Sequence, residues 1–423
     1  MSLQPQNFDA IIVGARVAGS AAAIMLGRQG RKVLLVDRAG FPSDIISTHI
    51  VLGGGARVLE RIGAFDELVR AGGHVFNRIR QRMPESDIVG TTRDGAGAER
   101  RGICLGRTLM DAAMLNLARS IDGVSVRERF LVSDLLVADG AVVGVRGDDP
   151  AGNYDFHAPL VIGADGMRST VGRIAGEKIA GAFSRTDLPC ARSYYYAYYS
   201  GARIDQLDGL VHAEYDAAPG LFHIACRCEN GLVVAGVGFD SAELDEFKRD
   251  LPGSYHRRVA ASQVCAEVLS GATLASKVFA VPKLYNTLRI PVCNGALLLG
   301  DAGLHVDPIL GQGHSFALMS AEIMAQLADH WFAAGRGRFI DAETLSNFTR
   351  ERDAQLGVHY QSAVAISQRL APDTEGALLQ RAASSEQWAI DELVSFGAML
   401  LGPGEFPSVR LQQLMASAQH AQA

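Results

Sequence analysis

Asp9-Ala10-Ile11-Ile12-Val13-Gly14-Ala15-Arg16-Val17-Ala18-Gly19 is followed by small and apolar residues to Arg28, and then by Lys32-Val33-Leu34-Leu35-Val36-Asp37. The pattern predicts a buried strand over 9–13, a glycine turn, a helix over 20–28 that Gly30 ends, and a second strand over 32–36. The helix N-terminus offers free N–H groups to phosphates, and the acid about 20 residues after the glycines can accept ribose hydroxyls. This βαβ unit predicts a dinucleotide site; a purely structural turn is the alternative.

Arg16 occupies the position where the usual glycine fingerprint has its middle glycine. That glycine normally lets the backbone approach the pyrophosphate. The guanidinium has four alternatives: it lies on the phosphates, reaches neighbouring acids, points into a substrate cavity, or is solvated. The residues expected at the dinucleotide are Gly14, Arg16, Val17, Ala18, Gly19, Asp37 and Arg38.

Two further strand–turn–helix junctions follow along the chain. Leu160-Val161-Ile162-Gly163-Ala164-Asp165-Gly166 is an apolar strand that runs into an acid and a glycine. Gly300-Asp301-Ala302-Gly303-Leu304-His305-Val306-Asp307-Pro308-Ile309-Leu310-Gly311-Gln312-Gly313 lies between an apolar run at 296–299 and a helical pattern at 314–332. An acid at a strand end can hold sugar hydroxyls, and a Gly/Pro loop lets backbone approach a flat or anionic ligand. Each junction alone is compatible with an ordinary turn.

The three junctions in this order resemble the FAD-dependent monooxygenases of the para-hydroxybenzoate hydroxylase type, to which geranylgeranyl reductases and flavin-dependent halogenases are related. The resemblance covers residues 9 to about 335. It implies that Gly14, Gly19 and Asp37 bind the ADP half of FAD and that Asp165 supports the cofactor. It also implies that Asp301 holds the ribityl chain and that Pro308, Gly311 and Gly313 lie beside the isoalloxazine. Gly300, which precedes Asp301, is also expected to bind the cofactor. Arg107, in Leu105-Gly106-Arg107-Thr108-Leu109-Met110-Asp111, matches an arginine that contacts the cofactor; a solvated helix-start arginine is the alternative.

The resemblance implies an FAD-dependent monooxygenase. Such an enzyme hydroxylates an aromatic or polycyclic small molecule through a flavin C4a-hydroperoxide, with NAD(P)H as electron donor and O2 as co-substrate. A reductase of the geranylgeranyl reductase branch is the first alternative, although the Tyr-x-Trp-x-Phe-Pro signature of those reductases is absent. A halogenase is less favoured, because the only tryptophans are Trp331 and Trp388. A flavin-binding protein without turnover is the remaining alternative.

The expected fold class is α/β: a Rossmann-like FAD-binding domain with an inserted antiparallel substrate sheet and a helical C-terminal tail. We expect the FAD-binding domain at 1–80, 100–185 and 285–335, the substrate domain at 81–99 and 186–284, and the tail at 336–423. Within the insertion, strands are predicted at 191–200, 211–215, 221–228 and 232–239, with a turn at Asn230-Gly231. We also predict loops at 53–55 and 94–98, helices at 59–71, 108–120 and 242–268, and a strand at 273–281.

Four residues are candidates for substrate contact: His49, Tyr196, Tyr198 and His223. Tyr194, Tyr196 and Tyr198 share one face of their strand, and Tyr195 and Tyr199 share the other. Either face can wall a pocket for an aromatic substrate, or the rings can simply be half-buried with hydrated hydroxyls. His49 and His223 are equally compatible with structural roles.

Composition limits the class of protein. The chain has 423 residues with a net charge of −6, which gives no support for binding nucleic acid. No apolar run approaches the length of a membrane span, and the six scattered cysteines are expected to be reduced thiols of a cytoplasmic protein. We expect no metal site, because Cys226 and Cys228 are two residues apart on the same face of a strand, which is poor for a zinc knuckle. A monomer or a homodimer is expected.

Overall fold

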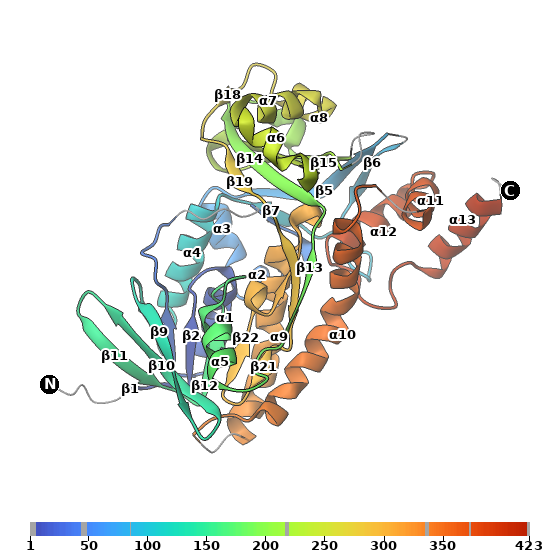
Figure 1. The fold of residues 1–423 in the computed structure, drawn as a ribbon. Helices are drawn as coiled ribbons and strands as arrows, with labels where there is room; N and C mark the ends of the chain where they lie inside the picture. The colour runs from blue at the N-terminus through green and yellow to red at the C-terminus, as the bar shows by residue number, and fades with distance from the viewer. Residues whose placement is uncertain are drawn as a thin grey trace.

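The first βαβ unit lies at the centre of a six-stranded sheet in the computed structural model, which describes residues 6–43, 49–84, 86–215, 220–334, 338–371 and 374–420 (Figure 1). The strand order is β21-β22-β12-β2-β3-β8, and every pair except β21–β22 is parallel. The strands are β2 (Ala10–Val13), β3 (Val33–Val36), β8 (Val124–Arg127), β12 (Leu160–Gly163), β21 (Val292–Cys293) and β22 (Ala296–Leu298).

The three strands that precede the glycine-containing junctions are direct neighbours. β22 pairs with β12, and β12 pairs with β2, all in parallel. Because the carboxyl ends of parallel strands lie at one edge, the three junctions meet there although up to about 300 residues separate them. All residues of these strands are buried, as expected for a parallel sheet covered on both faces.

Helices cover one face of this sheet and a second, smaller sheet covers the other. The helical face carries α1 (Val17–Arg28), α4 (Arg107–Arg119) and α9 (Gly313–Ala334), with α1 packed against both others. The opposite face carries α5 (Thr170–Lys178) and the antiparallel strands β9 (Leu131–Ala138), β10 (Ala141–Asp149) and β11 (Gly152–His157), to which β1 (Gln6–Asn7) adds in parallel. The expected α/β class with an inserted antiparallel sheet is confirmed.

A ten-stranded sheet forms the upper part of the molecule in Figure 1. Its order is β18-β14-β17-β16-β15-β5-β7-β4, with β19 beside β14 and β6 beside β5. β4, β7 and most of β5 belong to it although they lie in ranges that we expected to belong to the FAD-binding domain. The strands are β4 (Ile50–Val51), β5 (His74–Met83), β6 (Ser86–Thr91), β7 (Gly102–Cys104), β14 (Arg192–Ser200), β15 (Gly209–Tyr215), β16 (Phe222–Arg227), β17 (Val233–Asp240), β18 (Thr273–Leu274) and β19 (Phe279–Val281).

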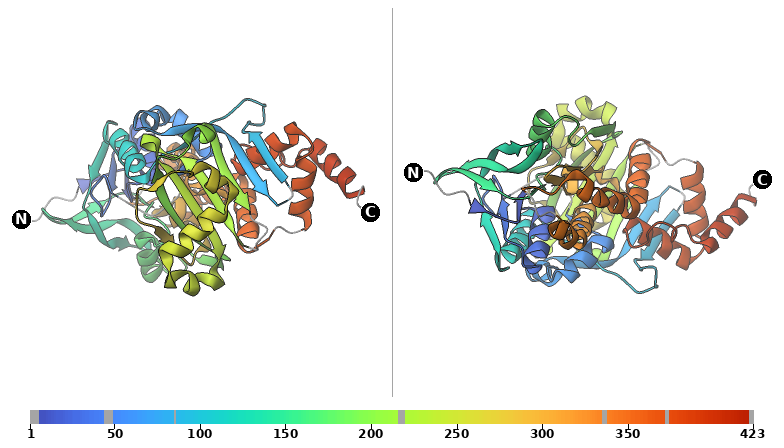
Figure 2. Two further views of the ribbon diagram at one scale, coloured as in Figure 1. Left: turned by 90° about the horizontal axis from the view of Figure 1, so that it is seen from above. Right: turned by 90° about the horizontal axis from the view of Figure 1, so that it is seen from below.

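Three short helices cover the outer face of this large sheet, as the view from above shows (Figure 2). They are α6 (Leu244–Arg249), α7 (Leu251–Ala261) and α8 (Gln263–Val268), so the helix expected over 242–268 is interrupted twice. The strand expected over 273–281 is likewise divided into β18 and β19. A small third sheet consists of β13 (Arg185–Pro189), β20 (Tyr285–Arg289) and β23 (Leu304–His305). In sequence, β13 comes just before the insertion that contains β14–β19, and β20 and β23 come just after it.

The expected loop at 53–55 is wrong: these glycines form the first turn of α2 (Gly53–Arg61). A Cβ on Gly54 would lie 2.4 Å from the carbonyl oxygen of Met399, and one on Gly55 would lie 2.8 Å from Cα of Ser315. The glycines therefore permit close packing of α2 rather than a turn. The helix expected over 59–71 is broken near Gly63, whose φ is +64°, before α3 (Phe65–Arg70).

The tail is helical, as expected, with α10 (Ala342–Ser367), α11 (Thr374–Ala383), α12 (Gln387–Gly397) and α13 (Val409–His420). α10 packs along α9, and α11–α13 extend from the side opposite β9–β11 (Figures 1 and 2). No helix within the described ranges combines the length and apolarity needed to cross a bilayer.

Candidate functional site

A cleft of about 370 Å³ opens where the three junctions meet at the carboxyl edge of the parallel sheet. Most of the expected cofactor residues line it, whereas Gly19, Gly300, Pro308 and Gly311 do not. The lining includes Gly14, Arg16, Val17, Ala18, Asp37, Arg38, Arg107, Asp165, Asp301 and Gly313. Tertiary structure thus assembles one elongated site from segments around residues 14, 37, 107, 165, 301 and 313.

The first glycines are required by close backbone approach. Gly14 has a φ of +105°, and a Cβ there would lie 2.3 Å from the carbonyl oxygen of Ala164. A Cβ on Gly19 would lie 1.8 Å from the carbonyl oxygen of Gly14. Gly19 therefore lets α1 begin directly against the turn, which leaves the helix N-terminus facing the cleft.

Asp37 is held rigidly at the end of β3. Its side-chain oxygens accept hydrogen bonds from Ala15 N and Ala39 N, both at 2.8 Å, and the residue is only 8% exposed. Each carboxylate oxygen retains a second lone pair that can accept a hydroxyl. This geometry fits the expected contact with a ribose.

Arg16 reaches a neighbouring acid, which is one of the four alternatives left by the sequence. Its guanidinium forms an ion pair with Asp111 and donates to Ser43 Oγ at 2.9 Å. Arg107 Nη2 lies 3.0 Å from both carboxylate oxygens of the same Asp111, whose side chain is completely buried. Two cations that line the cleft share one anion, so the cleft retains a net positive charge here, which suits a pyrophosphate.

Sequence reasoning missed Asp111. A signal was present, because Arg107 and Asp111 are four residues apart and therefore share one face of α4. Nothing in the sequence shows that Arg16, 95 residues away, joins them.

Asp165 lines the cleft, and one of its carboxylate oxygens has no hydrogen-bond partner within the described part of the chain. Its Oδ2 accepts from Thr170 N at 2.6 Å and Val171 N at 3.1 Å at the start of α5. The buried Oδ1 makes no hydrogen bond within the described part of the chain, and burial raises the pKa of Asp165. A buried acceptor without a donor is costly unless a ligand supplies one, so this position fits a hydroxyl-bearing group.

Asp301 follows β22 in a 3-10 turn (Gly300–Ala302), and its side chain is 43% exposed in the cleft. Burial acts to raise the pKa of Asp301, but His305, His314 and Arg107 outweigh it and the pKa lies below its usual range. His305 Nδ1 lies 3.4 Å from Asp301 Oδ2, and the pair raises the pKa of His305 against the effect of its burial. The Asp301 carboxyl is therefore ionised near neutral pH. An ionised carboxylate can accept hydrogen bonds from the hydroxyls of a sugar alcohol.

His314, to which sequence reasoning assigned no role, lines the cleft beside Gly313 at the start of α9. Burial, with Arg107 nearby, lowers the pKa of His314 to about 4, so the ring is neutral at pH 7. Its Nδ1 lies 3.0 Å from Ile50 O and must carry the proton, which leaves Nε2 as an acceptor. The N-terminus of α9 adds a positive dipole end to the cleft.

The loop between β23 and α9 leaves open space at its glycines. Gly311 has a φ of +67°, and a Cβ on Gly311 or Gly313 would meet nothing within 4 Å. Protein packing therefore does not require glycine at position 313, and the open space is compatible with the expected approach of a flat ligand. Pro308 begins the 3-10 turn Pro308–Leu310, and Asp307 caps this turn by accepting from Ile309 N at 2.9 Å.

The face of β14 with the even-numbered tyrosines contacts the loop before α9 through Tyr194 and the residue before β4, His49, through Tyr198. Tyr194 donates its hydroxyl to Asp307 in the loop. Tyr198 hydrogen-bonds His49 Nε2, and Tyr196 stacks on Phe279 with ring centroids 5.1 Å apart. Tyr195 and Tyr199 pack instead with the core under α6–α8.

His223 is separated from the other three substrate candidates. It lies on the outer face of β16, where its Nε2 is 2.8 Å from the carbonyl oxygen of Arg258 in α7. His49, Tyr196 and Tyr198 lie on the inner face, where their rings contact one another edge to face.

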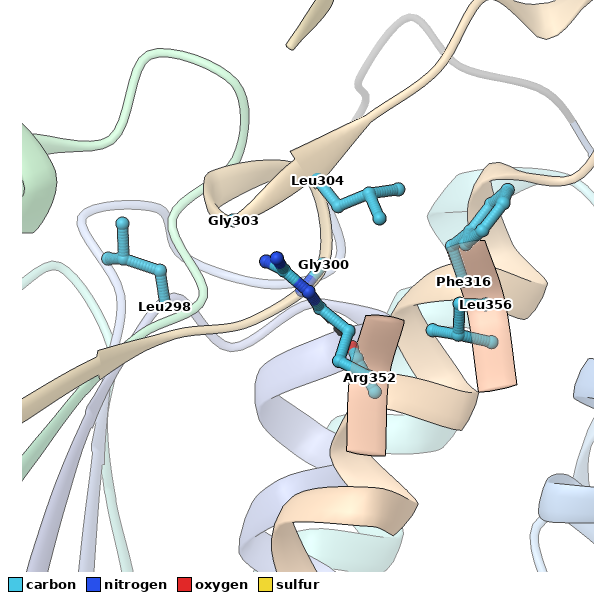
Figure 3. Close-up of a pocket in the computed structure, with 8 residues that line it drawn as sticks. Leu298, Gly300, Gly303, Leu304, Phe316, Arg352 and Leu356 are labelled. Atoms are coloured by element: carbon cyan, nitrogen blue, oxygen red, sulfur yellow. Dashed lines mark hydrogen bonds between the residues drawn. The ribbon is translucent and has the colours of Figure 1, made fainter. Parts of the chain in front are cut away.

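A second cavity, below Gly300, is too small for a ligand. It measures about 10 Å³ and is lined by Ser320, Phe316 and Arg352 among others; Figure 3 shows Arg352 reaching toward Gly300 from α10. This volume corresponds to about one water molecule.

Comparison with known proteins is consistent with this geometry. Residues 7–190 match the family model described as an FAD binding domain, and the chain is an FAD-binding domain protein. It is a distant relative of the geranylgeranyl reductases: digeranylgeranylglycerophospholipid reductase 1 from Methanococcoides burtonii is 27% identical over 328 residues, 76% of each chain. We therefore identify the chain as an FAD-dependent oxidoreductase.

Solved structures share the fold. The flavin-dependent brominase Bmp2 superposes with a TM-score of 0.78 at 15% identity over 99% of both chains. PqsL, a probable FAD-dependent monooxygenase from Pseudomonas aeruginosa, gives 0.69 at 20% identity over 93% of this chain and 99% of its own. At these identities the likeness establishes the fold alone.

Proposed function

We propose that this oxidoreductase is a monooxygenase that hydroxylates an aromatic or polycyclic small molecule, with NAD(P)H as electron donor and O2 as co-substrate. The observation that carries the proposal is the tyrosine-rich inner face of β14, which joins the loop before α9 through the bond from Tyr194 to Asp307. An aromatic wall beside the loop suits a flat substrate, because aromatic rings pack favourably by stacking and edge-to-face contact.

In this proposal the chain binds and orients FAD, and the bound FAD supplies the electron transfer and oxygen activation. Asp37 accepts from a ribose, Asp301 and Asp165 accept from hydroxyls further along the cleft, and the pair Arg16–Arg107 faces the phosphates. The start of α9 stabilises negative charge on the reduced cofactor.

His49 and Tyr198 have the chemistry to hold a substrate proton. The phenol of Tyr198 and Nε2 of His49 are hydrogen-bonded, and His49 is only 4% exposed. A proton can move between the two atoms, so a phenolic substrate that bonds to Tyr198 can lose its proton to His49. Loss of that proton makes the ring electron-rich, as attack by an electrophilic oxygen requires.

The test is a screen of phenols, polyketide-like aromatics and isoprenoids for compounds that accelerate NAD(P)H oxidation by the yellow, FAD-containing protein. The product from isotopically labelled O2 is expected to carry one labelled oxygen atom. Tyr198→Phe should keep its FAD and lose about 100-fold or more of the stimulated rate, the scale of acid–base catalysis. Tyr199→Phe, which removes a hydroxyl from the outer face, is the matched control.

Reduction of an isoprenoid is the second candidate, and the relationship to the Methanococcoides burtonii reductase favours it. A reductase would saturate a carbon–carbon double bond without O2 and would insert no oxygen. Turnover under anaerobic conditions with an isoprenoid would therefore replace the monooxygenase proposal. Dependence on a halide ion would indicate halogenation, and NAD(P)H oxidation unaffected by any compound would indicate a binding protein.

A further inference from the structure

Three cysteines from two separate strands meet at one buried point of the large sheet. Cys104 ends β7, Cys226 lies in β16, and Cys228 follows β16 by one residue. The Cys104 sulfur lies 3.4 Å from that of Cys226 and 3.3 Å from that of Cys228. The three side chains are at most 2% exposed, and their sulfurs all lie within 4.8 Å of one another.

The strand order shows that neighbouring strands do not bring these sulfurs together. β15 and β5 separate β16 from β7 in the strand order, so the sulfurs are brought together by the curvature of the sheet and not by strand pairing. The spacing of Cys226 and Cys228 places both on one face, and Cys104 supplies the third sulfur from the facing wall. The other buried cysteines, Cys265 and Cys293, belong to different core clusters.

We propose that Cys104, Cys226 and Cys228 form a site for a single thiophilic metal ion of the d10 class, to which Zn²⁺ and Cu⁺ belong. Soft thiolate ligands select these ions. A metal–sulfur distance of about 2.3 Å places three sulfurs about 4 Å apart around an ion. The two separations from the Cys104 sulfur need to expand by only about 0.6 Å, which small side-chain rotations provide.

The surroundings favour capture of an ion over exchange with solvent. Ile50, Leu52, Phe76 and Leu400 pack around the sulfurs, so an ion bound there is shielded from water. Each thiol that binds the ion releases its proton to solvent, and the d10 ion keeps its oxidation state.

The site has a structural consequence for the cleft. Cys104 pairs with Ile50 in β4, and the next residue, Leu105, donates its N–H to the carbonyl oxygen of His49 at 3.0 Å. Arg107 follows two residues later, at the start of α4. The end of β7 is therefore connected both to His49 and to Arg107. An ion that links β7 to β16 would fix both residues relative to the tyrosine-rich wall. A metal ion could bind these cysteines whichever reaction the flavin performs.

The experiment uses the full-length, FAD-containing protein, reduced and freed of metal with a chelator. It is titrated anaerobically with Cd²⁺ as a spectroscopic probe and separately with Zn²⁺. We expect one ion per chain, an ultraviolet sulfur-to-cadmium charge-transfer band, and an increase in melting temperature. Cys226→Ala should abolish the band and weaken binding by about 100-fold or more, whereas Cys265→Ala should behave like the parent.

Cys228→Ser is the second variant, at the end of the strand, in case Cys226→Ala does not fold. It is expected to weaken Cd²⁺ binding in the same way. The proposal is overturned if the parent protein binds Cd²⁺ no more tightly than these variants, because the cysteines are then only small apolar core residues. It is equally overturned if the cluster of the freshly purified protein proves to be a disulfide.

Discussion

Replacement of Asp111 by alanine tests the charge network that supports the cleft. The Asp111 carboxylate is fully buried and pairs with two guanidiniums, of which the Arg107 side chain is 8% exposed and the Arg16 side chain 22% exposed. Loss of one partner of a buried ion pair costs about 3–5 kcal/mol, because a desolvated charge remains. Since solvent can still reach part of Arg16, we expect Asp111→Ala to lower the free energy of unfolding by about 3 kcal/mol.

The measurement is urea unfolding of the protein without added FAD, followed by fluorescence and circular dichroism. Glu60→Ala is the control, because Glu60 pairs with Arg101 at 2.8 Å where the two side chains are 33% and 47% exposed. An exposed pair contributes less than about 1 kcal/mol. The double variant Arg107→Ala/Asp111→Ala should lose less than the sum of the single variants. If Asp111→Ala is no less stable than Glu60→Ala, the buried network does not carry the energy that we assign to it.

Three further predictions concern Asp301 and Arg16. Asp301→Ala should weaken FAD binding by about 10- to 150-fold, because each hydrogen bond to a charged group contributes about 1.5–3 kcal/mol; unchanged affinity in a flavin fluorescence titration would show that Asp301 does not hold the ligand. The Asp301–His305 pair should stabilise the FAD-free protein most between about pH 4 and pH 6.5. The pKa of Asp301 lies below its usual range, so its contribution is lost as pH falls through that pKa; the pKa of His305 is raised, so its contribution is lost as pH rises through it. In Asp301→Asn this maximum should flatten in thermal unfolding measured across pH. Arg16→Gly should keep FAD affinity within a few-fold, because Arg107 still holds Asp111, whereas Arg16→Glu should weaken it strongly; parental affinity in Arg16→Glu would exclude Arg16 from the site.

Local sequence carries the information about each strand–turn–helix junction. The buried runs at 10–13, 33–36, 160–163 and 296–298 contain only apolar residues and glycine, and a glycine or an acid follows each within two residues. The strands and the acids at their ends were therefore predictable. Asp37, Asp165 and Asp301 are recognisable for this reason: backbone geometry at a strand end depends on a few neighbouring residues. Resemblance to a known family then supplied the part of the cofactor that each junction is expected to bind.

Tertiary packing alone decided which distant residues meet. The pairing of β22 with β12 and of β12 with β2 joins the three junctions, and the ion pair between Arg16 and Asp111 spans 95 residues. The periodicity of β14 placed Tyr194, Tyr196 and Tyr198 on one face, but only the tertiary structure showed that this face contacts Asp307 in the loop before α9 and His49.

Contacts between distant residues also explain why local sequence did not predict the helix at 53–61 or the cysteine cluster. Three consecutive glycines indicate a turn when only local propensity is considered, yet here Met399 and Ser315 occupy the space that side chains would need. Cys104 is 122 residues from Cys226, and no local pattern records the curvature of the sheet that brings their sulfurs together. Sequence specifies the elements and the chemistry at their ends, because these depend on near neighbours; the contacts between elements depend on shape complementarity across the whole fold.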